Sequence, residues 1–345
     1  MTLNKRLGII AYANNTGLGN QTRQYYEWLK PAKTMVVDLS DMQRQSGKNV
    51  TSYFERYPDG LIIEGIPSNL AINSFLEDLD VVLVAETPLN HYLFKRAAEL
   101  NIRTILVPNY EFNDYLQHPW LPRPDLLLLP SKWHMQETKE LGIQMQHIPM
   151  PVDRSKLPFI HRKKAEHFVH IAGHPTFMDR NGTAVVLEAM QYVKSPIQLT
   201  MYSQFPIEAY TDDRINLVTT DVKEYWELYK PEYDVMVMPR RYGGLCLPLN
   251  EAMSVGMPVL MTDVPPQNEF LPPEMLIREV GYDIIQTRAE IECWKPSPKA
   301  LAAKIDELYN KPELVDNLSK AVDNLAEARS WKKLAPIYME IINNL

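Results

Sequence analysis

The chain has 345 residues, of which 45% are hydrophobic and 23% are charged, and its formal net charge is −7. This composition is typical of a globular protein long enough for two domains, and the negative charge argues against an overall basic surface for nucleic acid or an anionic membrane. Two cysteines do not make a disulfide framework, and no apolar stretch has the length of a signal peptide or a membrane span. We therefore expect a cytoplasmic protein without a membrane span.

Short apolar runs alternate with helical patterns along the first half of the chain. The apolar runs predict strands at Leu7–Ala13, Met35–Leu39, Leu61–Glu64, Val81–Ala85, Thr104–Pro108 and Leu126–Pro130. The intervening segments predict helices at Asn20–Leu29, Ser68–Leu76, Leu89–Leu100 and Trp133–Leu141. Such alternation favours a parallel sheet covered by helices.

A second series of the same kind fills the rest of the chain. It predicts strands at Phe168–Ala172, Gln198–Tyr202, Asn216–Thr219, Val235–Met238, Val259–Thr262 and Leu276–Val280. It predicts helices at Gly182–Met190, Lys223–Tyr229, Leu249–Val255 and Pro298–Tyr309. We expect an α/β fold with one Rossmann-like domain over residues 1–152 and a second over 153–328. Residues 329–345, which include Ser330-Trp331, form an amphipathic helix that needs a surface to cover.

The most informative stretch of the chain runs from Pro239 to Met253. An apolar run leads into a glycine-containing turn, and a helix is expected to open near Pro248, with Glu251 in its first turn. Backbone N–H groups at such a turn can bind phosphate, and a carboxylate there can accept hydrogen bonds from a ribose diol. The pattern therefore indicates a nucleotide site, although a plain strand-to-helix turn with an acid favoured by the helix dipole has the same features.

This stretch resembles a motif of the retaining glycosyltransferases with the GT-B fold, the glycosyl transferases group 1. That family usually reads Pro-Ser-x-x-Glu-Gly-Phe-Gly-Leu-Pro-x-x-Glu-Ala. The matching positions are Pro239, Gly244, Leu247, Pro248, Glu251 and Ala252. The departures are Arg240 for Ser, Gly243 for the first Glu, and Leu245-Cys246 for Phe-Gly. The resemblance implies two Rossmann-like domains facing each other across a cleft, with a C-terminal helix that crosses back to the first domain.

The resemblance also implies where the donor would bind. In that family the first strand-to-helix turn touches the donor, and two cations of the second domain neutralise its diphosphate, for which this chain offers His174 and Arg180. Either backbone N–H groups of Gly243, Gly244 and Leu245 would replace the family's sugar-binding acid, or the sugar would be held differently. The expected donor-binding residues are Thr16, Gly17, His174, Arg180, Arg240, Arg241, Gly243, Gly244, Leu245 and Glu251.

On the acceptor side, Glu86 and Glu111 each follow an apolar strand and would orient a hydroxyl, although ordinary helix-capping acids fit the same pattern. The expected catalytic residues are Arg180, Glu111 and Glu86. The expected acceptor-side residues are Asn15, His91, Tyr110 and Glu111. No histidine and cysteine cluster has the spacing of metal ligands, so no essential metal and no permanently bound cofactor are expected.

These observations predict a glycosyltransferase that moves a sugar from a UDP-sugar or GDP-sugar to an acceptor hydroxyl, with retention of anomeric configuration. The acceptor class stays open between a saccharide, a protein and a modified DNA base, and no oligomeric state is predicted. Three alternatives remain. The first is a glycosyltransferase acting on hydroxymethylated DNA bases. The second is a non-catalytic subunit that binds nucleotide sugar or a partner, which the absence of an acid at Gly243 favours. The third is a nucleotide-sugar epimerase.

Overall fold

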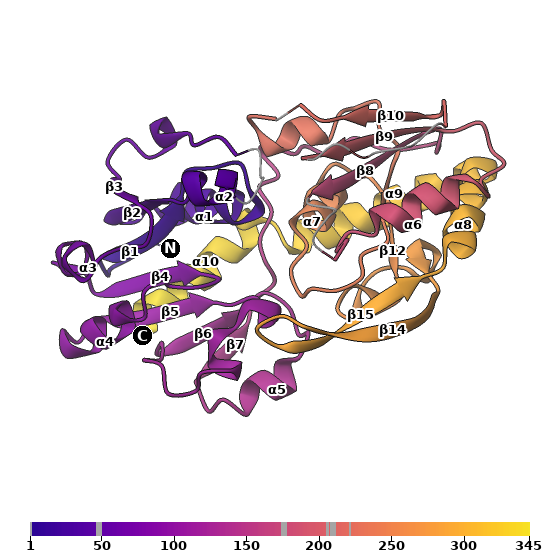
Figure 1. Ribbon diagram of the computed structural model, residues 1–345. Coiled ribbons are helices and arrows are strands. Elements are labelled where there is room, and N and C mark those ends of the chain that lie inside the picture. Colours follow the sequence, from indigo (N-terminus) through magenta and orange to yellow (C-terminus); the bar gives the residue numbers. More distant parts are fainter. Residues whose placement is uncertain (1, 46–49, 174–177, 205–206, 208–211, 221) are drawn as a thin grey trace. The chain divides into compact units, whose positions relative to one another are not determined.

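The computed structural model describes residues 2–45, 50–173, 178–204, 207, 212–220 and 222–345 (Figure 1). The chain divides into two compact units. The first unit comprises Met1–Met150, Thr287–Ala289 and Trp331–Leu345, and the second comprises Pro151–Gln286 and Glu290–Ser330.

The first unit is built on a parallel sheet in which the described strands follow the order β3-β2-β1-β4-β5-β6-β7 (Figure 1). Their bounds are β1 Leu7–Tyr12, β2 Lys33–Asp38, β3 Leu61–Glu64, β4 Val81–Ala85, β5 Arg103–Val107, β6 Leu126–Leu129 and β7 Met145–His147. The central strands are apolar and fully buried, which is the pattern expected of a sheet covered on both faces. The order reverses between β1 and β4, so the carboxyl ends of these strands form the edge at which such folds bind ligands.

Short helices connect the strands of the first unit. Their bounds are α1 Gly17–Leu29, α2 Ser40–Gln45, α3 Asn69–Leu76, α4 Tyr92–Glu99 and α5 Met135–Lys139, and 3-10 turns cover Phe54–Arg56, Tyr110–Phe112 and Asp114–Leu116. The C-terminal helix α10, Trp331–Asn344, also belongs to this unit and packs on α1. Its buried Trp331 donates a hydrogen bond from Nε1 to Gln24 Oε1, at 2.8 Å. The predicted return of the last helix to the first domain is confirmed.

The second unit repeats the arrangement, with the described strands in the order β10-β9-β8-β11-β12-β13 and all pairs parallel. Their bounds are β8 His167–Gly173, β9 Gln198–Ser203, β10 Ile215–Val218, β11 Val235–Met238, β12 Val259–Thr262 and β13 Leu276–Ile277. The chain order reverses between β8 and β11. The predicted fold class, two α/β units each with a parallel sheet, is confirmed.

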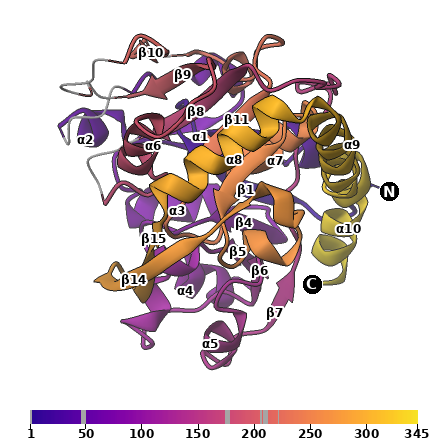
Figure 2. The ribbon, with the colours of Figure 1, turned by 90° about the vertical axis from the view of Figure 1, so that its right-hand side faces the viewer.

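The helices of the second unit are α6 Thr183–Met190, α7 Leu247–Ser254, α8 Pro298–Asn310 and α9 Pro312–Ala328, with 3-10 turns at Tyr225–Leu228, Gln267–Glu269 and Pro273–Met275. Helix α8 packs beside α6, and α9 packs beside α7 (Figure 2). An antiparallel hairpin, β14 Glu279–Gln286 and β15 Glu290–Pro296, extends this unit.

Several predicted elements differ from the structure. The helix expected over Lys223–Tyr229 is a 3-10 turn, Tyr225–Leu228. The strand expected over Leu276–Val280 divides into the short β13 and the start of the hairpin. Helix α1 begins at Gly17 rather than Asn20, because the Thr16 side chain caps it. Glu251 lies in the second turn of α7, not in the first, because that helix begins at Leu247.

Candidate functional site

Two loops meet at the carboxyl edge of the second sheet, where the strand order reverses. One loop follows β8 and the other follows β11. The backbone N–H of Arg241 donates to the carbonyl of Arg180 at 2.8 Å, and Arg240 Nη1 donates to Asn181 Oδ1 at 3.2 Å. Gly182 allows this close approach, since a Cβ there would lie 2.4 Å from the carbonyl oxygen of Pro239. The two loops therefore form one connected surface at the predicted ligand edge.

Arg240 and Arg241 hold the glycine-containing turn in shape. Arg240 is only 5% exposed and donates from Nη2 to the carbonyl of Leu245 at 2.6 Å. Arg241 donates from Nε to the carbonyl of Trp294 and from Nη1 to the carbonyl of Met178, both at 3.0 Å. These hydrogen bonds within the protein use several N–H groups of each guanidinium. Contact of either arginine with a nucleotide-sugar ligand stays a prediction.

Arg180 is placed differently from its two neighbours. Its guanidinium carbon lies 4.8 Å from the centroid of the Tyr242 ring, so the cation sits over an aromatic face and its side chain is half-buried. The Tyr242 hydroxyl is buried and has no hydrogen-bond partner among the described residues. His174, the other expected cation, lies outside the described residues.

The start of α6 is already capped by the protein. Asp179 Oδ1 accepts a hydrogen bond from the backbone N–H of Thr183 at 2.7 Å, and its Oδ2 accepts from Ala184 at 2.9 Å. Since the carboxylate occupies these donors, α6 does not offer them to a diphosphate. By contrast, α7 begins after Cys246 without a capping side chain.

Glu251 is the most unusual acid of the second unit. It is 4% exposed, and its Oε2 accepts a hydrogen bond from the Tyr229 hydroxyl at 2.5 Å. Its Oε1 is buried without a hydrogen-bond partner in the part of the chain that the structure describes. Burial raises the pKa of Glu251 to about 7, against the lowering effect of the Tyr229 hydrogen bond. A buried acceptor of this kind favours a ligand that brings a hydroxyl donor.

The turn between β11 and α7 uses the conformational freedom of glycine. Gly243 has φ 109°, in the region that side chains other than glycine rarely adopt. A glutamate at this position, where the resembled family has one, would be strained in the observed backbone. The departure of the chain from the family motif therefore has a structural reason.

In the first unit, the turn after β1 is held by its own side chains. Thr16 Oγ1 donates to Asn14 Oδ1 at 2.6 Å and accepts from the backbone N–H of Gly19 at 3.3 Å. Gly17 is the first residue of α1 and is exposed, while Asn15 is half-buried. Contact of these residues with a ligand stays a prediction.

Glu86 lies at the end of β4, beside the first unit's reversal of strand order. Its backbone is left-handed, with φ 62°, and its Oε2 accepts from Asn109 Nδ2 at 2.8 Å. The negative charge of Glu86 and the burial of Tyr12 together raise the pKa of that tyrosine, burial being the larger cause. A role of Glu86 in orienting an acceptor stays a prediction.

The other acceptor-side candidates already take part in contacts. His91 Nε2 lies 3.1 Å from Asp114 Oδ2, and its Nδ1 lies 3.5 Å from the Tyr115 hydroxyl. Glu111 is only 1% exposed. An acid that orients an acceptor hydroxyl was expected to be more accessible. Tyr110 stacks on His134, with 4.2 Å between ring centroids.

Sequence reasoning missed Tyr229, Asn181 and Tyr242. Tyr229 lies 22 positions before Glu251, and no local motif links the two. Asn181 donates from Nδ2 to the carbonyl of Ile171 at 3.0 Å and so ties its loop to β8. Tyr242 stands inside the motif, but the family pattern has no fixed residue there.

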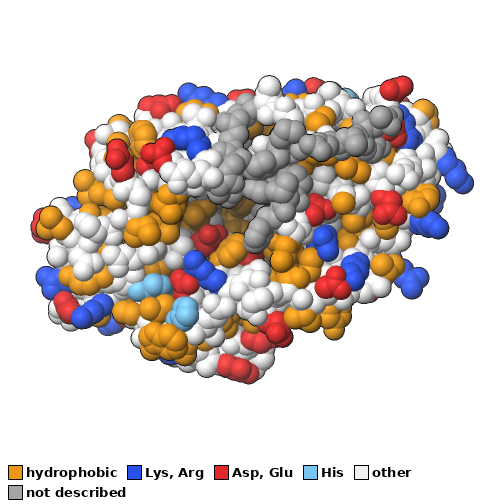
Figure 3. Space-filling model, viewed as in Figure 1, with side chains coloured by type: hydrophobic (Ala, Val, Ile, Leu, Met, Phe, Trp, Pro, Cys, Tyr) orange, Lys and Arg blue, Asp and Glu red, His pale blue; other side chains and the backbone are white. Residues whose placement is uncertain are grey.

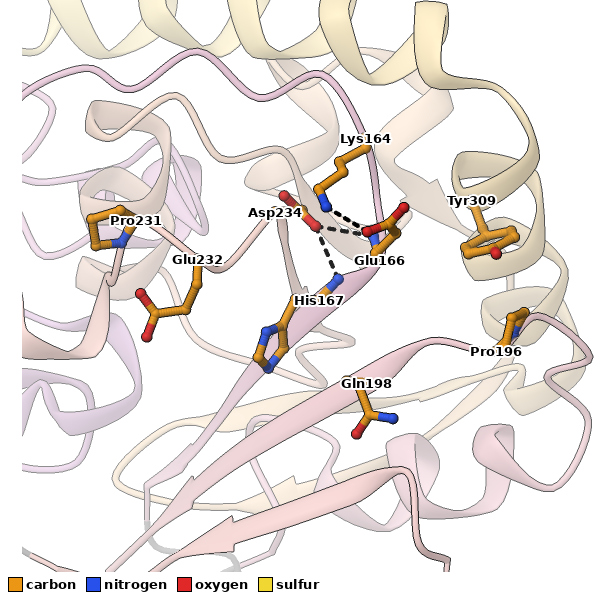
Figure 4. A pocket seen from close by; sticks show the side chains of 9 residues that line it. All are labelled: Lys164, Glu166, His167, Pro196, Gln198, Pro231, Glu232, Asp234 and Tyr309. Carbon is orange, nitrogen blue, oxygen red and sulfur yellow. Dashed lines mark hydrogen bonds and ion pairs between the residues drawn. The ribbon is translucent and has the colours of Figure 1, made fainter.

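A cavity of about 460 Å³ opens at the opposite, amino-terminal edge of the second sheet (Figure 4). Asp234 points toward the start of β8 and accepts hydrogen bonds from the backbone N–H groups of Glu166 and His167, at 3.0 and 2.9 Å. Lys164 pairs with Glu166 beside it. These interactions join the amino ends of β8 and β11.

The wider surface and the fold add few further candidates. On the face shown in Figure 3, basic and acidic side chains are interspersed. Among the described residues, no group of three or more His, Cys, Asp or Glu side chains is arranged to hold a metal ion. No helix in the described part of the chain is long and apolar enough to cross a membrane.

Residues 212–324 match the family model for glycosyl transferases group 1, so the predicted resemblance is confirmed. The matched segment contains the turn after β11, Tyr229 and Glu251. No curated protein matches the chain in sequence.

Solved glycosyltransferase structures share the fold over the whole chain. HepE of Anabaena, in complex with UDP, is 8% identical with a TM-score of 0.71, covering 99% of this chain and 100% of its own. Sucrose-phosphate synthase of Thermosynechococcus elongatus is 15% identical with a TM-score of 0.65, covering 98% and 99%. A glycosyltransferase of Rickettsia africae is 13% identical with a TM-score of 0.66, covering 99% and 98%. The chain therefore has the GT-B fold.

Proposed function

Starting from a chain with the GT-B fold, whose residues 212–324 match the group 1 glycosyltransferases, we propose that this protein transfers a sugar from a nucleoside diphosphate sugar to an acceptor hydroxyl. The second unit would bind the donor, at the carboxyl edge of β8 and β11. The first unit would supply the groups that face the acceptor.

The observation that carries this proposal is the buried, unpartnered Oε1 of Glu251, as judged over the described residues. Leaving a buried carboxylate oxygen without a donor costs about 1–3 kcal/mol or more, so a site that keeps one is suited to a ligand that supplies a donor. A ribose hydroxyl of the nucleotide is such a group. The position of Glu251, on the helix that follows β11, is the one that the family resemblance implies for ribose binding.

The leaving diphosphate needs positive charge, and Arg180 is our candidate for supplying it. Its guanidinium lies over Tyr242 at the same sheet edge as the turn that contains Gly243 and Gly244. A guanidinium can bind phosphate oxygens in a bidentate manner, and backbone N–H groups of the turn would add further donors. UDP-sugar and GDP-sugar are the donors that we propose, and HepE of Anabaena has been solved with UDP-glucose.

The reaction is a substitution at the anomeric carbon. The bond from that carbon to the diphosphate oxygen breaks, the bond to the acceptor oxygen forms, and the acceptor proton passes to the departing diphosphate. With this route the new bond forms on the face that the diphosphate leaves, so we propose retention and no covalent intermediate on the protein. Arg180 would stabilise the charge that grows on the diphosphate.

Glu86 is our candidate for orienting the acceptor hydroxyl. It stands at the end of β4 in a left-handed backbone, and Asn109 fixes one of its oxygens. Glu111 and His91 are weaker candidates, because Glu111 is almost fully buried and His91 already contacts Asp114 and Tyr115. The acceptor itself is proposed only as a molecule with a free hydroxyl, a saccharide being the simplest case.

The proposal is tested by incubating the protein with UDP-, GDP- and ADP-sugars and a panel of saccharide acceptors, and measuring release of nucleoside diphosphate together with the glycosylated product. We expect one donor class to be consumed with formation of product. The alternative is a non-catalytic subunit, which is favoured because Gly243 stands where the family has a glutamate. Such a subunit would bind a nucleotide sugar but release no diphosphate. If the protein neither binds nor consumes any of these donors, both the enzyme and the non-catalytic subunit are ruled out.

A further inference from the structure

We propose that Tyr229 is a positioning residue for Glu251, which holds one carboxylate oxygen and leaves the other, in a fixed direction, to accept a hydrogen bond from the nucleotide ribose. This inference rests on the proposed donor-binding function and deepens it. It predicts that the site distinguishes the two ribose hydroxyls, since a carboxylate held in one orientation presents its Oε1 unequally to them.

The geometry of the pair supports this role. Tyr229 directly follows the 3-10 turn Tyr225–Leu228, and Glu251 is in α7, so the hydrogen bond joins two elements on either side of β11. Both residues are 4% exposed, and the donor and acceptor oxygens are 2.5 Å apart. A tyrosine hydroxyl has one proton, which it donates here to Oε2. The carboxylate cannot rotate without losing this bond, so its free Oε1 has a fixed direction.

The fixed arrangement limits how a ribose can bind. A carboxylate with both oxygens available can accept one hydrogen bond from each hydroxyl of a ribose diol. In this protein Tyr229 already binds Oε2, which disfavours a side-by-side contact of the diol with both oxygens, so the hydroxyl nearer Oε1 makes the stronger, charge-assisted hydrogen bond. Removal of the other hydroxyl should then have less effect on affinity.

The electrostatics of the pair provide a second readout. Burial holds the pKa of Glu251 near 7, and the Tyr229 hydrogen bond counteracts that rise. The other titratable groups that interact with the pair are Cys246, just before α7, and Tyr225 in the 3-10 turn; neither is a cation or a carboxylic acid. A hydroxyl donor at Oε1 favours the ionised form, so nucleotide affinity should rise as pH increases through 7. Without the Tyr229 hydroxyl, this midpoint should move to higher pH.

The first arm of the test uses the unmodified protein. Binding of UDP, GDP and ADP is measured by calorimetry, and the nucleotide that binds is compared with its 2′-deoxy and 3′-deoxy analogues. We expect one analogue to bind about tenfold more weakly or worse, as loss of a hydrogen bond to a charged group predicts, and the other to bind nearly as well as the parent. Equal losses for both analogues, or no loss for either, would overturn the inference.

The second arm compares Tyr229→Phe with Tyr233→Phe over pH 5.5–8.5. Tyr233 is a matched control, because it is also buried in the second unit and its hydroxyl makes a 2.9 Å hydrogen bond, but to Tyr202. We expect only Tyr229→Phe to move the midpoint of nucleotide affinity to higher pH. An unchanged midpoint in Tyr229→Phe would count against the positioning role even if its affinity fell.

The outcomes also separate this inference from the function on which it rests. If the unmodified protein binds none of the three nucleoside diphosphates, the proposed function fails. If it binds one but treats the two deoxy analogues alike, the function stands and the role of Tyr229 is wrong. The deoxy comparison requires no variant, so it remains decisive even if Tyr229→Phe does not fold.

Discussion

The guanidinium of Arg180 lies over the aromatic ring of Tyr242, with 4.8 Å between its carbon and the ring centroid. The contact joins the loop after β8 to the turn after β11, at the edge where the strand order of the second sheet reverses. Contact with the aromatic face restrains the plane of the guanidinium at this edge.

We predict that Arg180→Ala weakens binding of nucleoside diphosphate by more than about tenfold, because a diphosphate clamp contributes several charge-assisted hydrogen bonds. Binding of the corresponding nucleoside, which has no phosphate, should change little. Calorimetry with both ligands measures the difference. Arg154→Ala is a suitable control, since Arg154 is committed to ion pairs with Asp323 and Glu327 of α9. Equal weakening of nucleoside and nucleotide would remove Arg180 from the phosphate site.

The cap of α6 gives a prediction about stability. Asp179→Ala removes the acceptor for the N–H groups of Thr183 and Ala184, so the free energy of unfolding should fall by about 0.5–2 kcal/mol. Urea denaturation measures the change, and Asp179→Asn should recover part of it, because an amide oxygen can still cap. A stability of Asp179→Ala equal to that of the unmodified protein would show that the cap is not used in solution.

The buried carboxyl of Glu251 predicts a pH dependence of stability. Its folded pKa of about 7 is above the ordinary value of 4.5, so the folded state binds more protons than the unfolded state between these values. The contribution of this group to stability is therefore present below about pH 4.5 and is lost as pH rises toward 7. The shift corresponds to roughly 3 kcal/mol at most.

The change Glu251→Gln keeps the shape of the side chain and removes its titration. We predict that this variant becomes more stable relative to the unmodified protein between pH 5 and pH 8, as measured by urea denaturation at each pH. If the free energy of unfolding of the variant instead falls relative to that of the unmodified protein as pH rises, Glu251 is ionised and stabilised in the folded protein.

The C-terminal helix gives a prediction for the first unit. Trp331 is fully buried, stacks parallel to Trp28 and donates to Gln24. Trp331→Ala should lower the free energy of unfolding by about 3–5 kcal/mol through loss of this packing. Trp331→Phe should lose about 1–3 kcal/mol, because the buried Gln24 acceptor is left without its donor. If both variants unfold at the same urea concentration as the unmodified protein, α10 does not pack on α1 in solution.

Much of the fold could be predicted from the sequence because its strands are continuous apolar runs. The runs that became β1, β4, β6 and β11 are buried on both faces, and the turn residues between them are distinct. Helix α9 was not predicted, although Leu314, Val315, Leu318 and Val322 have helical spacing. The β14–β15 hairpin was not predicted either, because its outward residues, such as Val280 and Ile284, are apolar and so the polar–apolar alternation of a half-exposed strand is missing.

The candidate site was predictable only where a local motif carries it. The turn after β11 and Glu251 follow from one short stretch of sequence. Tyr229 and Asn181 do not, because each acts through a contact formed when distant strands meet. The sequence also does not show which charged side chains are used within the protein. The charge of Arg240 suggested that it binds a ligand, but in the folded chain it donates hydrogen bonds to Asn181 and Leu245.

Titration of the protein with UDP, GDP and ADP, alongside the Glu251→Ala variant, tests the central claim most directly. We predict saturable binding of one nucleoside diphosphate to the unmodified protein, and binding at least about tenfold weaker to the variant, because the buried acceptor for a ribose hydroxyl is gone. Absence of binding by all three nucleotides at millimolar concentration, or equal affinity in the variant, would contradict it.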